Sequence, residues 1–171
     1  HLSSLTTLDL SQNKLTSLPD SIGHLSSLIS IYLSSNQLTT LPETIGQLTS
    51  LKNLKLSLNQ LTSLPESIGH LTSLASINPD CNQLTSLPDS ICRLSLTTLN
   101  LMYNRLIELP RTIGQLKSLE YLYLRHNQLM SIPASIGQLT ALKGISLPNN
   151  NLKLLPASIG QLTLLNELNL Y

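Results

Sequence analysis

Residues 51–73 read LKNLKLSLNQLTSLPESIGHLTS, and the rest of the chain repeats this stretch with small changes. Aligned on its first leucine, the unit starts at Leu5, Leu28, Leu51, Leu74, Leu96, Leu119, Leu142 and Leu165. Successive starts are 23 residues apart, with one interval of 22, so the 171 residues hold seven full repeats and the beginning of an eighth. Self-similarity at this period predicts a stack of equivalent structural units.

The recurrent positions of the unit each predict a structural role. Leucines in the order Leu-x-x-Leu-x-Leu are typical of a short strand with alternate side chains pointing inward. The ninth position is always asparagine, and we expect a column of these side chains to hydrogen-bond buried backbone groups. The fifteenth position is always proline, which predicts an extended segment. The following acid and the Ser/Thr-Ile-Gly sequence predict a short helical turn and a tight return to the next strand.

One such strand cannot stand alone, so successive repeats must stack into a parallel sheet. The motif Leu-x-x-Leu-x-Leu-x-x-Asn-x-Leu resembles the leucine-rich repeat family. Its second half, as in LTSLPESIGHLTSL at residues 61–74, resembles the 23-residue class of plant intracellular Ras-group-related proteins and of bacterial effectors. The resemblance implies an α/β solenoid over residues 1–171: a right-handed, single-domain arc with a parallel inner β-sheet and short helical, 3-10 or extended segments on its convex side.

Composition and charge argue against several classes of partner. Ten basic and nine acidic residues give a net charge of +1, which supplies no field for nucleic acid or an anionic membrane. No apolar run approaches the roughly 20 residues that span a bilayer. The two cysteines, Cys81 and Cys92, are expected on opposite sides of their repeat, which disfavours a disulfide. We therefore expect an intracellular, cytoplasmic protein, or one in the host cytosol if it is a bacterial effector.

No arrangement of residues predicts catalysis, a cofactor or a metal. Cys81 and His126 occupy the same repeat position, but Tyr103 lies between them. Two strand spacings of about 4.8 Å place them beyond hydrogen-bond reach of each other. Zinc-binding motifs and a phosphate-binding glycine loop are both absent from the sequence. We therefore predict no catalytic, cofactor-binding or metal-binding residue.

The concave side of the predicted solenoid is the best candidate for binding. With the leucines inside, the third, fifth, seventh and eighth positions of each repeat face outward there, and all five tyrosines fall in this set. Tyrosine is enriched at interfaces because it offers a large apolar face and a hydroxyl, although it also favours strands in general. The predicted partner-binding residues are Tyr32, Met102, Tyr103, Tyr121, Tyr123, Arg125 and His126.

A second pattern is predicted on the outer side. The residue after the repeat proline is acidic in the first four repeats, and this stripe ends at the fifth. Its members are Asp20, Glu43, Glu66 and Asp89, followed by Arg111, Ala134 and Ala157. Helix capping accounts for the acids, and a basic partner is the alternative.

Repeat 4 and the two ends depart from the pattern. Pro79 replaces the second inward leucine of a strand, and Cys92 replaces the glycine in a repeat that is one residue short. We expect a local irregularity of the sheet there, as drift or as a functional hinge. Residues 1–4 match the tail of a preceding repeat, and neither end shows a polar capping unit. We expect the natural chain to continue in both directions, with self-association through uncapped ends as the alternative.

These observations predict a protein–protein interaction module that binds a protein partner on its concave face. By resemblance, it serves as a scaffold, a signalling regulator or the targeting domain of an effector. One alternative is the substrate-targeting domain of a larger enzyme, such as a ligase, kinase or GTPase. The other is a fragment of an extracellular recognition receptor.

Overall fold

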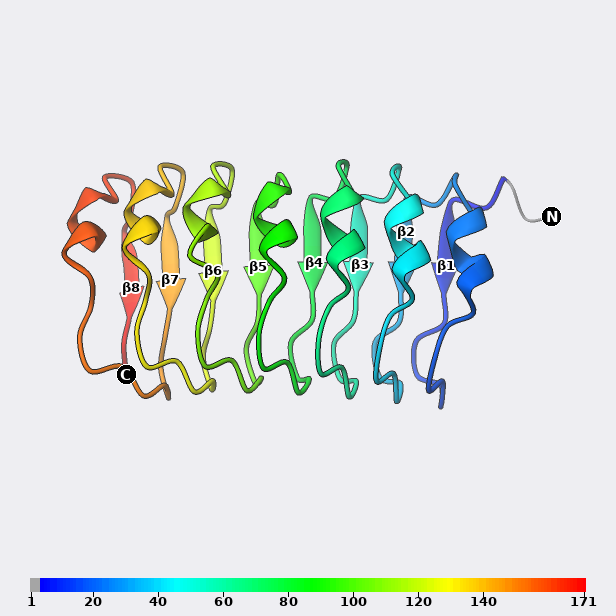
Figure 1. The fold of residues 1–171 in the computed structure, drawn as a ribbon, viewed down its shortest axis with the longest axis horizontal. Coiled ribbons are helices and arrows are strands. Elements are labelled where there is room, and N and C mark those ends of the chain that lie inside the picture. Colours follow the sequence, from blue (N-terminus) through cyan, green and yellow to red (C-terminus); the bar gives the residue numbers. More distant parts are fainter. Residues whose placement is uncertain (1–3) are drawn as a thin grey trace.

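The computed structural model describes residues 4–171, so the tail of a preceding repeat predicted at residues 1–4 lies mostly outside the described residues. Within this range, eight strands alternate with seven 3-10 helices (Figure 1). The strands are β1 (Thr7–Asp9), β2 (Ser30–Tyr32), β3 (Asn53–Lys55), β4 (Ser76–Asn78), β5 (Thr98–Asn100), β6 (Tyr121–Tyr123), β7 (Gly144–Ser146) and β8 (Glu167–Asn169). The helices are η1 (Asp20–His24), η2 (Glu43–Gln47), η3 (Glu66–His70), η4 (Asp89–Arg93), η5 (Ile113–Gln115), η6 (Ala134–Gln138) and η7 (Ala157–Gln161).

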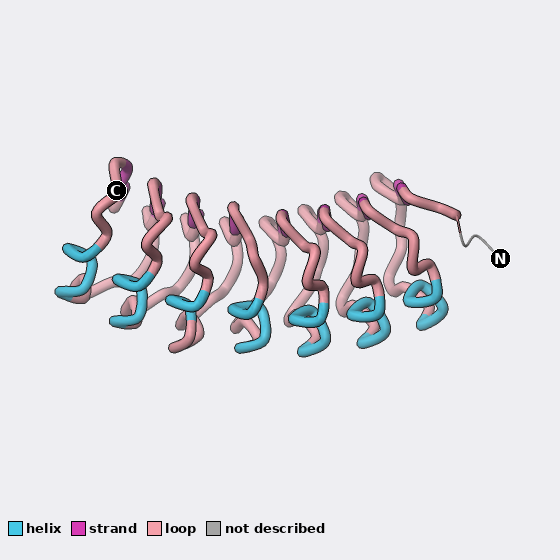
Figure 2. Tube along the Cα trace, turned by 90° about the horizontal axis from the view of Figure 1, so that it is seen from above, coloured by secondary structure: helices cyan, strands magenta, loops and turns pink. Residues whose placement is uncertain are grey.

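The strands form one parallel sheet in which their spatial order follows the chain from β1 to β8. Neighbouring strands pair at equivalent repeat positions, so that Leu54 of β3 lies opposite Ile77 of β4. Seen from above, the strands lie on one side of a gently curved stack and the 3-10 helices lie on the other (Figure 2). The predicted solenoid, with the sheet on its inner side, is confirmed. None of the helices in residues 4–171 has the length and apolar character needed to cross a bilayer.

The recurrent leucines and isoleucines fill the space between the sheet and the helices. In repeat 3, for example, Leu51, Leu54, Leu56 and Ile68 are all completely buried. Burying a side chain of this size contributes roughly 1.5–3 kcal/mol, so a column of equivalent residues supplies most of the stabilisation between repeats. This packing leaves the alternate strand residues facing outward along the concave side.

The asparagine column predicted from the sequence is present and links each repeat to the one before it. Asn59 donates through Nδ2 to the carbonyl oxygens of Leu33 at 2.9 Å and Leu56 at 3.0 Å, and its Oδ1 accepts from the Leu38 amide at 3.0 Å. The same three bonds recur at Asn36, Asn82, Asn104, Asn127 and Asn150. These bonds satisfy backbone groups that the turn would otherwise leave unpaired.

The helical-turn glycines of repeats 1, 2, 3, 5 and 6 serve close packing, which corrects the expectation that they allow a tight turn of the chain. None of the glycines in the described residues has a positive φ angle. A Cβ atom at Gly46 would instead lie 2.5 Å from the carbonyl oxygen of Ser67 in the next repeat. The missing side chain therefore lets successive helices stack closely.

The predicted irregularity at repeat 4 is also present. In repeat 3 the Leu56 amide donates to the carbonyl oxygen of Asn78 at 3.0 Å, but Pro79 has no amide hydrogen for the equivalent bond to Asn100. Strands β4 and β5 accordingly pair at two positions, whereas every other neighbouring pair in the described sheet pairs at three. Beyond the strand, the chain runs extended at Leu94, where ψ is 155°.

One feature of the turn after each strand is not predicted from the sequence. The eighth residue of every full repeat has a left-handed backbone, with φ between 53° and 59°. These residues are Gln12, Ser35, Leu58, Cys81, Tyr103, His126 and Asn149. Because this conformation costs roughly 1–2 kcal/mol for residues other than glycine, it is held in place by the stacked turns around it.

Candidate functional site

Strand β6 places two tyrosines on the concave face. Tyr121 and Tyr123 stand at its two ends, while Leu122 between them is completely buried in the core. The two rings lie nearly parallel, with 6.3 Å between their centroids and 6° between their planes. Both side chains therefore occupy the outward positions predicted for them, and we call the two stacked rings the aromatic surface.

Gly144 explains how Tyr121 is held. The two residues are opposite each other in the pairing of β6 with β7, and a Cβ atom at position 144 would lie 2.9 Å from Cδ1 of Tyr121. The phenol ring thus lies across the neighbouring strand, in space that any other residue at position 144 would occupy. Gly144 is the glycine that stands outside the helical turns of the repeat.

A second aromatic pair lies at the exit of β5 and β6. The rings of Tyr103 and His126 stack with 4.5 Å between centroids and 22° between planes. Both residues have a left-handed backbone, and Tyr103 is 46% exposed. The imidazole Nε2 lies 3.3 Å from Nδ2 of Asn149. Met102, half-buried, and Arg125, exposed, precede these two residues in their repeats.

An ion pair that the sequence reasoning missed borders the aromatic surface. Nζ of Lys143 lies 2.9 Å from Oε2 of Glu120, the residue before Tyr121. The hydrogen bond to Glu120 raises the pKa of Lys143. The signal was available, because the two residues occupy the second position of consecutive repeats and neighbouring strands lie about 4.8 Å apart.

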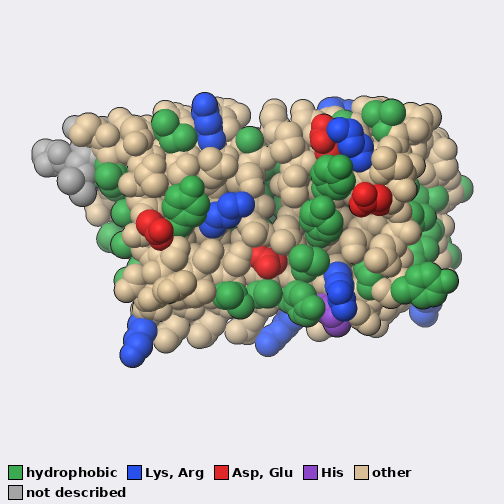
Figure 3. Space-filling model, turned by 180° about the vertical axis from the view of Figure 1, so that it is seen from behind, with side chains coloured by type: hydrophobic (Ala, Val, Ile, Leu, Met, Phe, Trp, Pro, Cys, Tyr) green, Lys and Arg blue, Asp and Glu red, His purple; other side chains and the backbone are tan. Residues whose placement is uncertain are grey.

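Tyr32 is not brought together with the other predicted residues. It lies on β2, in register with Asp9 of β1 and Lys55 of β3. Four strand spacings of about 4.8 Å separate β2 from β6, which places Tyr32 about 19 Å from the aromatic surface. We call the group that the structure does bring together the tyrosine patch: Met102, Tyr103, Tyr121, Tyr123, Arg125 and His126. In the space-filling view, hydrophobic side chains gather on this part of the sheet, with basic side chains and a histidine beside them (Figure 3).

The cysteines give this surface no nucleophile. Burial, and then the charge of Asp80, raise the pKa of Cys81. Burial also raises the pKa of Cys92. Both cysteines are free, and both thiols are therefore poor sources of thiolate at neutral pH. What the arrangement offers chemically is recognition: aromatic faces, hydroxyls, an imidazole and a guanidinium on a rigid sheet.

Comparisons with known families and structures agree with this architecture. A family model described as "Leucine-rich repeat region" matches residues 95–171, and one described as "Leucine rich repeat" matches residues 1–38 and 30–78. A search of curated proteins found no significant match.

Solved structures share the fold over nearly the whole chain. A leucine-rich repeat protein of Leptospira interrogans is 42% identical with a TM-score of 0.89, over 93% of this chain and 41% of that one. The ectodomain of the Arabidopsis thaliana receptor kinase GASSHO1/SCHENGEN3, in complex with CASPARIAN STRIP INTEGRITY FACTOR 2, is 31% identical with a TM-score of 0.88, over 98% of this chain and 21% of that one. The plant peptide hormone receptor RGFR1, in complex with RGF2, is 31% identical with a TM-score of 0.76, over 98% and 32%.

The chain spans less than half the length of each of these proteins. Its motif repeats every 23 residues, with one interval of 22, and builds a single parallel sheet and a column of asparagines. Together with the two family models, they show that the chain belongs to the leucine-rich repeat family, whose fold is a protein-interaction module.

Proposed function

We propose that this chain binds a protein partner through the tyrosine patch, as part of a scaffold, a signalling regulator or the targeting domain of an effector. The observation that carries the proposal is the grouping of three tyrosines, a histidine and an arginine on two adjacent repeats of the concave face. Tyrosine and arginine are the residue types that most often dominate binding energy at protein interfaces. Tyrosine contributes a large contact area at a low cost in side-chain entropy.

The rigidity of the patch supports the same role. Tyr121 lies across Gly144, and Tyr103 and His126 stack on each other, so these rings are already ordered before a partner arrives. Ordering an interface side chain on binding costs roughly 0.5–1.5 kcal/mol. A patch that is ordered in advance avoids part of that cost, and leaves more of the contact energy for affinity.

The similar structures also support a protein ligand. Two of the plant receptors are described in complex with a named ligand, CASPARIAN STRIP INTEGRITY FACTOR 2 in one case and RGF2 in the other. Because the chain is 31% identical to both and spans only 21–32% of them, a recognition segment of a larger receptor is the second candidate. Both candidates use the concave face in the same way, and they differ in what the flanking chain contributes.

Affinity capture followed by quantitative mass spectrometry tests the proposal. The baits are the unaltered chain, a Tyr121→Ala/Tyr123→Ala variant, and an Asp20→Asn/Glu43→Gln variant that alters the opposite side. We expect at least one protein to be retained by the unaltered and acid-altered baits and lost from the tyrosine-altered bait. Equal retention by all three folded baits would contradict the proposal. A Tyr32→Ala bait reports whether the interface extends beyond the patch as far as β2.

A further inference from the structure

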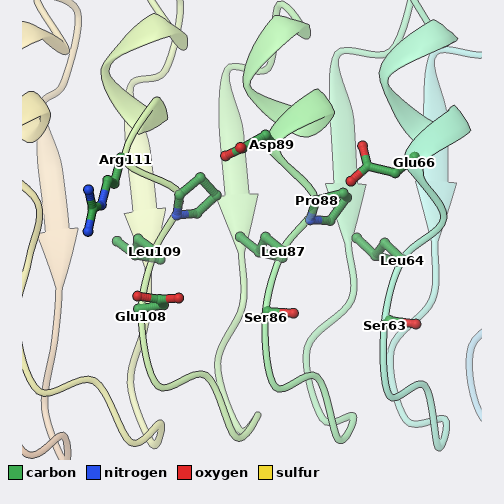
Figure 4. Close-up of a pocket in the computed structure, with 11 residues that line it drawn as sticks. Ser63, Leu64, Glu66, Ser86, Leu87, Pro88, Asp89, Glu108, Leu109 and Arg111 are labelled. Atoms are coloured by element: carbon green, nitrogen blue, oxygen red, sulfur yellow. The ribbon is translucent and has the colours of Figure 1, made fainter.

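A groove of about 510 Å³ crosses the face opposite the sheet, over repeats 3 to 5 (Figure 4). Its lining includes Pro88 and the small exposed edge of Leu87, which is otherwise buried. Carboxylates of Glu66, Asp89 and Glu108 stand along it, and Arg111 lies at its C-terminal end. The groove lies on the outer side of the solenoid, whereas the tyrosine patch lies on the concave sheet, so the two surfaces are separate.

The groove coincides with the irregular part of the stack. Cys92 carries a side chain where the neighbouring repeats have glycine, and a Cβ atom at the equivalent Gly69 would lie 2.6 Å from Cβ of Ser90 in the following repeat. The residue that faces Cys92 in this way is Thr112. Helix η5 begins only after it, at Ile113, whereas the other helices in the described chain begin two positions earlier in their repeats. Arg111, at one end of the groove, therefore precedes η5, whereas the equivalent Glu66 and Asp89 begin their helices.

Glu66 and Asp89 lie in the first turns of η3 and η4, but neither carboxylate makes a capping hydrogen bond to its own helix. In repeat 2, Oε2 of Glu43 accepts a hydrogen bond from the Ser67 amide at 3.1 Å. Within residues 4–171, Glu66 and Glu108 make no side-chain hydrogen bond, and Lys143–Glu120 is the sole ion pair. The Asp89 carboxylate accepts only from Oγ1 of Thr112, at 3.2 Å.

Arg111 leaves these charges uncompensated. Its guanidinium points away from Asp89 and Glu66 in the close-up, and it belongs to no ion pair in the described residues (Figure 4). Three carboxylates against one guanidinium give the groove a net charge of −2. Carboxylates beside Pro88 match a side chain with a hydrocarbon stem and a cationic end.

We propose that this groove docks an arginine-bearing extended segment of a protein partner. The arginine stem packs over Leu87 and Pro88, and its planar guanidinium bonds the carboxylates of Asp89 and Glu66 or Glu108. Arginine fits better than lysine because its donors can meet carboxylates in pairs. The groove would thus supply a second contact for a partner, or a contact for a second partner, on the side that the tyrosine patch does not use.

Titration with a matched pair of peptides tests this proposal. The probes are acetyl-Gly-Ala-Arg-Ala-Gly-amide and the same peptide with citrulline, which keeps the shape of arginine and removes its charge. Binding is followed by the backbone amide shifts of isotope-labelled protein. We expect saturable shifts at residues 87–89 and 108–111 with the arginine peptide, and binding about five-fold weaker with citrulline, equivalent to about 1 kcal/mol.

Three variants show whether the arginine peptide binds the groove and not another acidic site or the tyrosine patch. Glu66→Gln/Asp89→Asn should weaken the arginine peptide to the level of the citrulline peptide. Asp20→Asn, at the same repeat position outside the groove, should leave its binding unchanged. The Tyr121→Ala/Tyr123→Ala variant should bind the arginine peptide normally, whether or not the concave site proves real. Absence of shifts in the groove, or equal affinity for the two peptides, would overturn the proposal.

Discussion

Leu58, Tyr103 and His126 share an unfavourable, left-handed backbone conformation, although their side chains differ in chemistry. Each is the eighth residue of its repeat, directly before the buried asparagine, and each has φ between 54° and 58°. Asparagine tolerates this region better than other non-glycine residues, and Asn149 occupies the same position in repeat 7. The stacked turns therefore impose the conformation, and the side chain is free to vary. At repeats 5 and 6 that freedom places two rings on the edge of the tyrosine patch.

Leu58 allows this strain to be measured, because its side chain is 56% exposed and contributes little packing. Replacing Leu58 by Asn should stabilise the fold by about 0.5–1 kcal/mol, since asparagine adopts the left-handed region at lower cost. Leu58→Val should destabilise it, because β-branched residues are the least tolerant of positive φ. Urea unfolding of both variants gives the free energies. If valine proves as stable as asparagine, the turn does not carry the strain described.

The asparagine turn adds hydrogen bonds to the apolar packing that joins one repeat to the next. Each internal asparagine is less than 10% exposed and bonds two carbonyl oxygens and one amide. Leu33 and Leu56 each accept from two asparagines of consecutive repeats, so their carbonyls keep one partner if one asparagine is lost. The Leu38 amide has Asn59 as its acceptor. Loss of an internal asparagine therefore leaves one buried donor unpaired.

Asn59→Ala should lower the free energy of unfolding by about 2–3 kcal/mol, because a buried unpaired amide costs roughly 1–3 kcal/mol and the lost bonds add to it. Asn13 is the matched control, since it is exposed and bonds only Leu10 and Ser11 of its own turn. Asn13→Ala should cost less than about 1 kcal/mol, because water replaces its bonds. Chemical denaturation measures both. Similar losses for the two variants would show that burial of the column does not matter.

The sequence predicted these elements well because each follows from residue types that every full repeat shares. The strands, the proline before each helical turn and the asparagine bonds all follow from the 23-residue pattern. Contacts between repeats were harder to predict. The placement of Tyr121 over Gly144 and the Glu120–Lys143 ion pair depend on which side chains meet across a strand spacing. The left-handed turn was missed because no glycine marks it.

At the scale of the whole molecule, the junction between repeats 4 and 5 is the weak point of the stack. It lacks a ladder hydrogen bond at Pro79, one of the three paired positions that the other neighbouring strands have, and the full length of η5. In a solenoid each repeat contacts only its neighbours, so a weak junction reduces the coupling between the two sides. The tyrosine patch lies on one side of this junction, on repeats 5 and 6, and the groove spans it.

Pro79→Leu should repair the junction and stabilise the fold by about 1 kcal/mol. The restored amide can donate to Asn100, and a leucine buries more apolar surface than proline, which together outweigh the added freedom of the unfolded chain. Hydrogen exchange should slow for the amides of β4 and β5 more than for those of β2 and β3. A variant of equal or lower stability, with unchanged exchange at β5, would place the weakness elsewhere.

In our proposal, the partner binds the concave surface beside β6. Ser146 lies opposite Tyr123 in the sheet, whereas Ala157 is exposed at the start of η7 on the opposite side. The photo-crosslinking residue p-benzoylphenylalanine replaces Ser146 in one variant and Ala157 in another. Each variant is mixed with the protein retained in the capture experiment and illuminated, and the covalent adducts are measured. We predict covalent adducts with that protein from position 146 and none from position 157. Adducts from position 157 alone would contradict the assignment of the binding face.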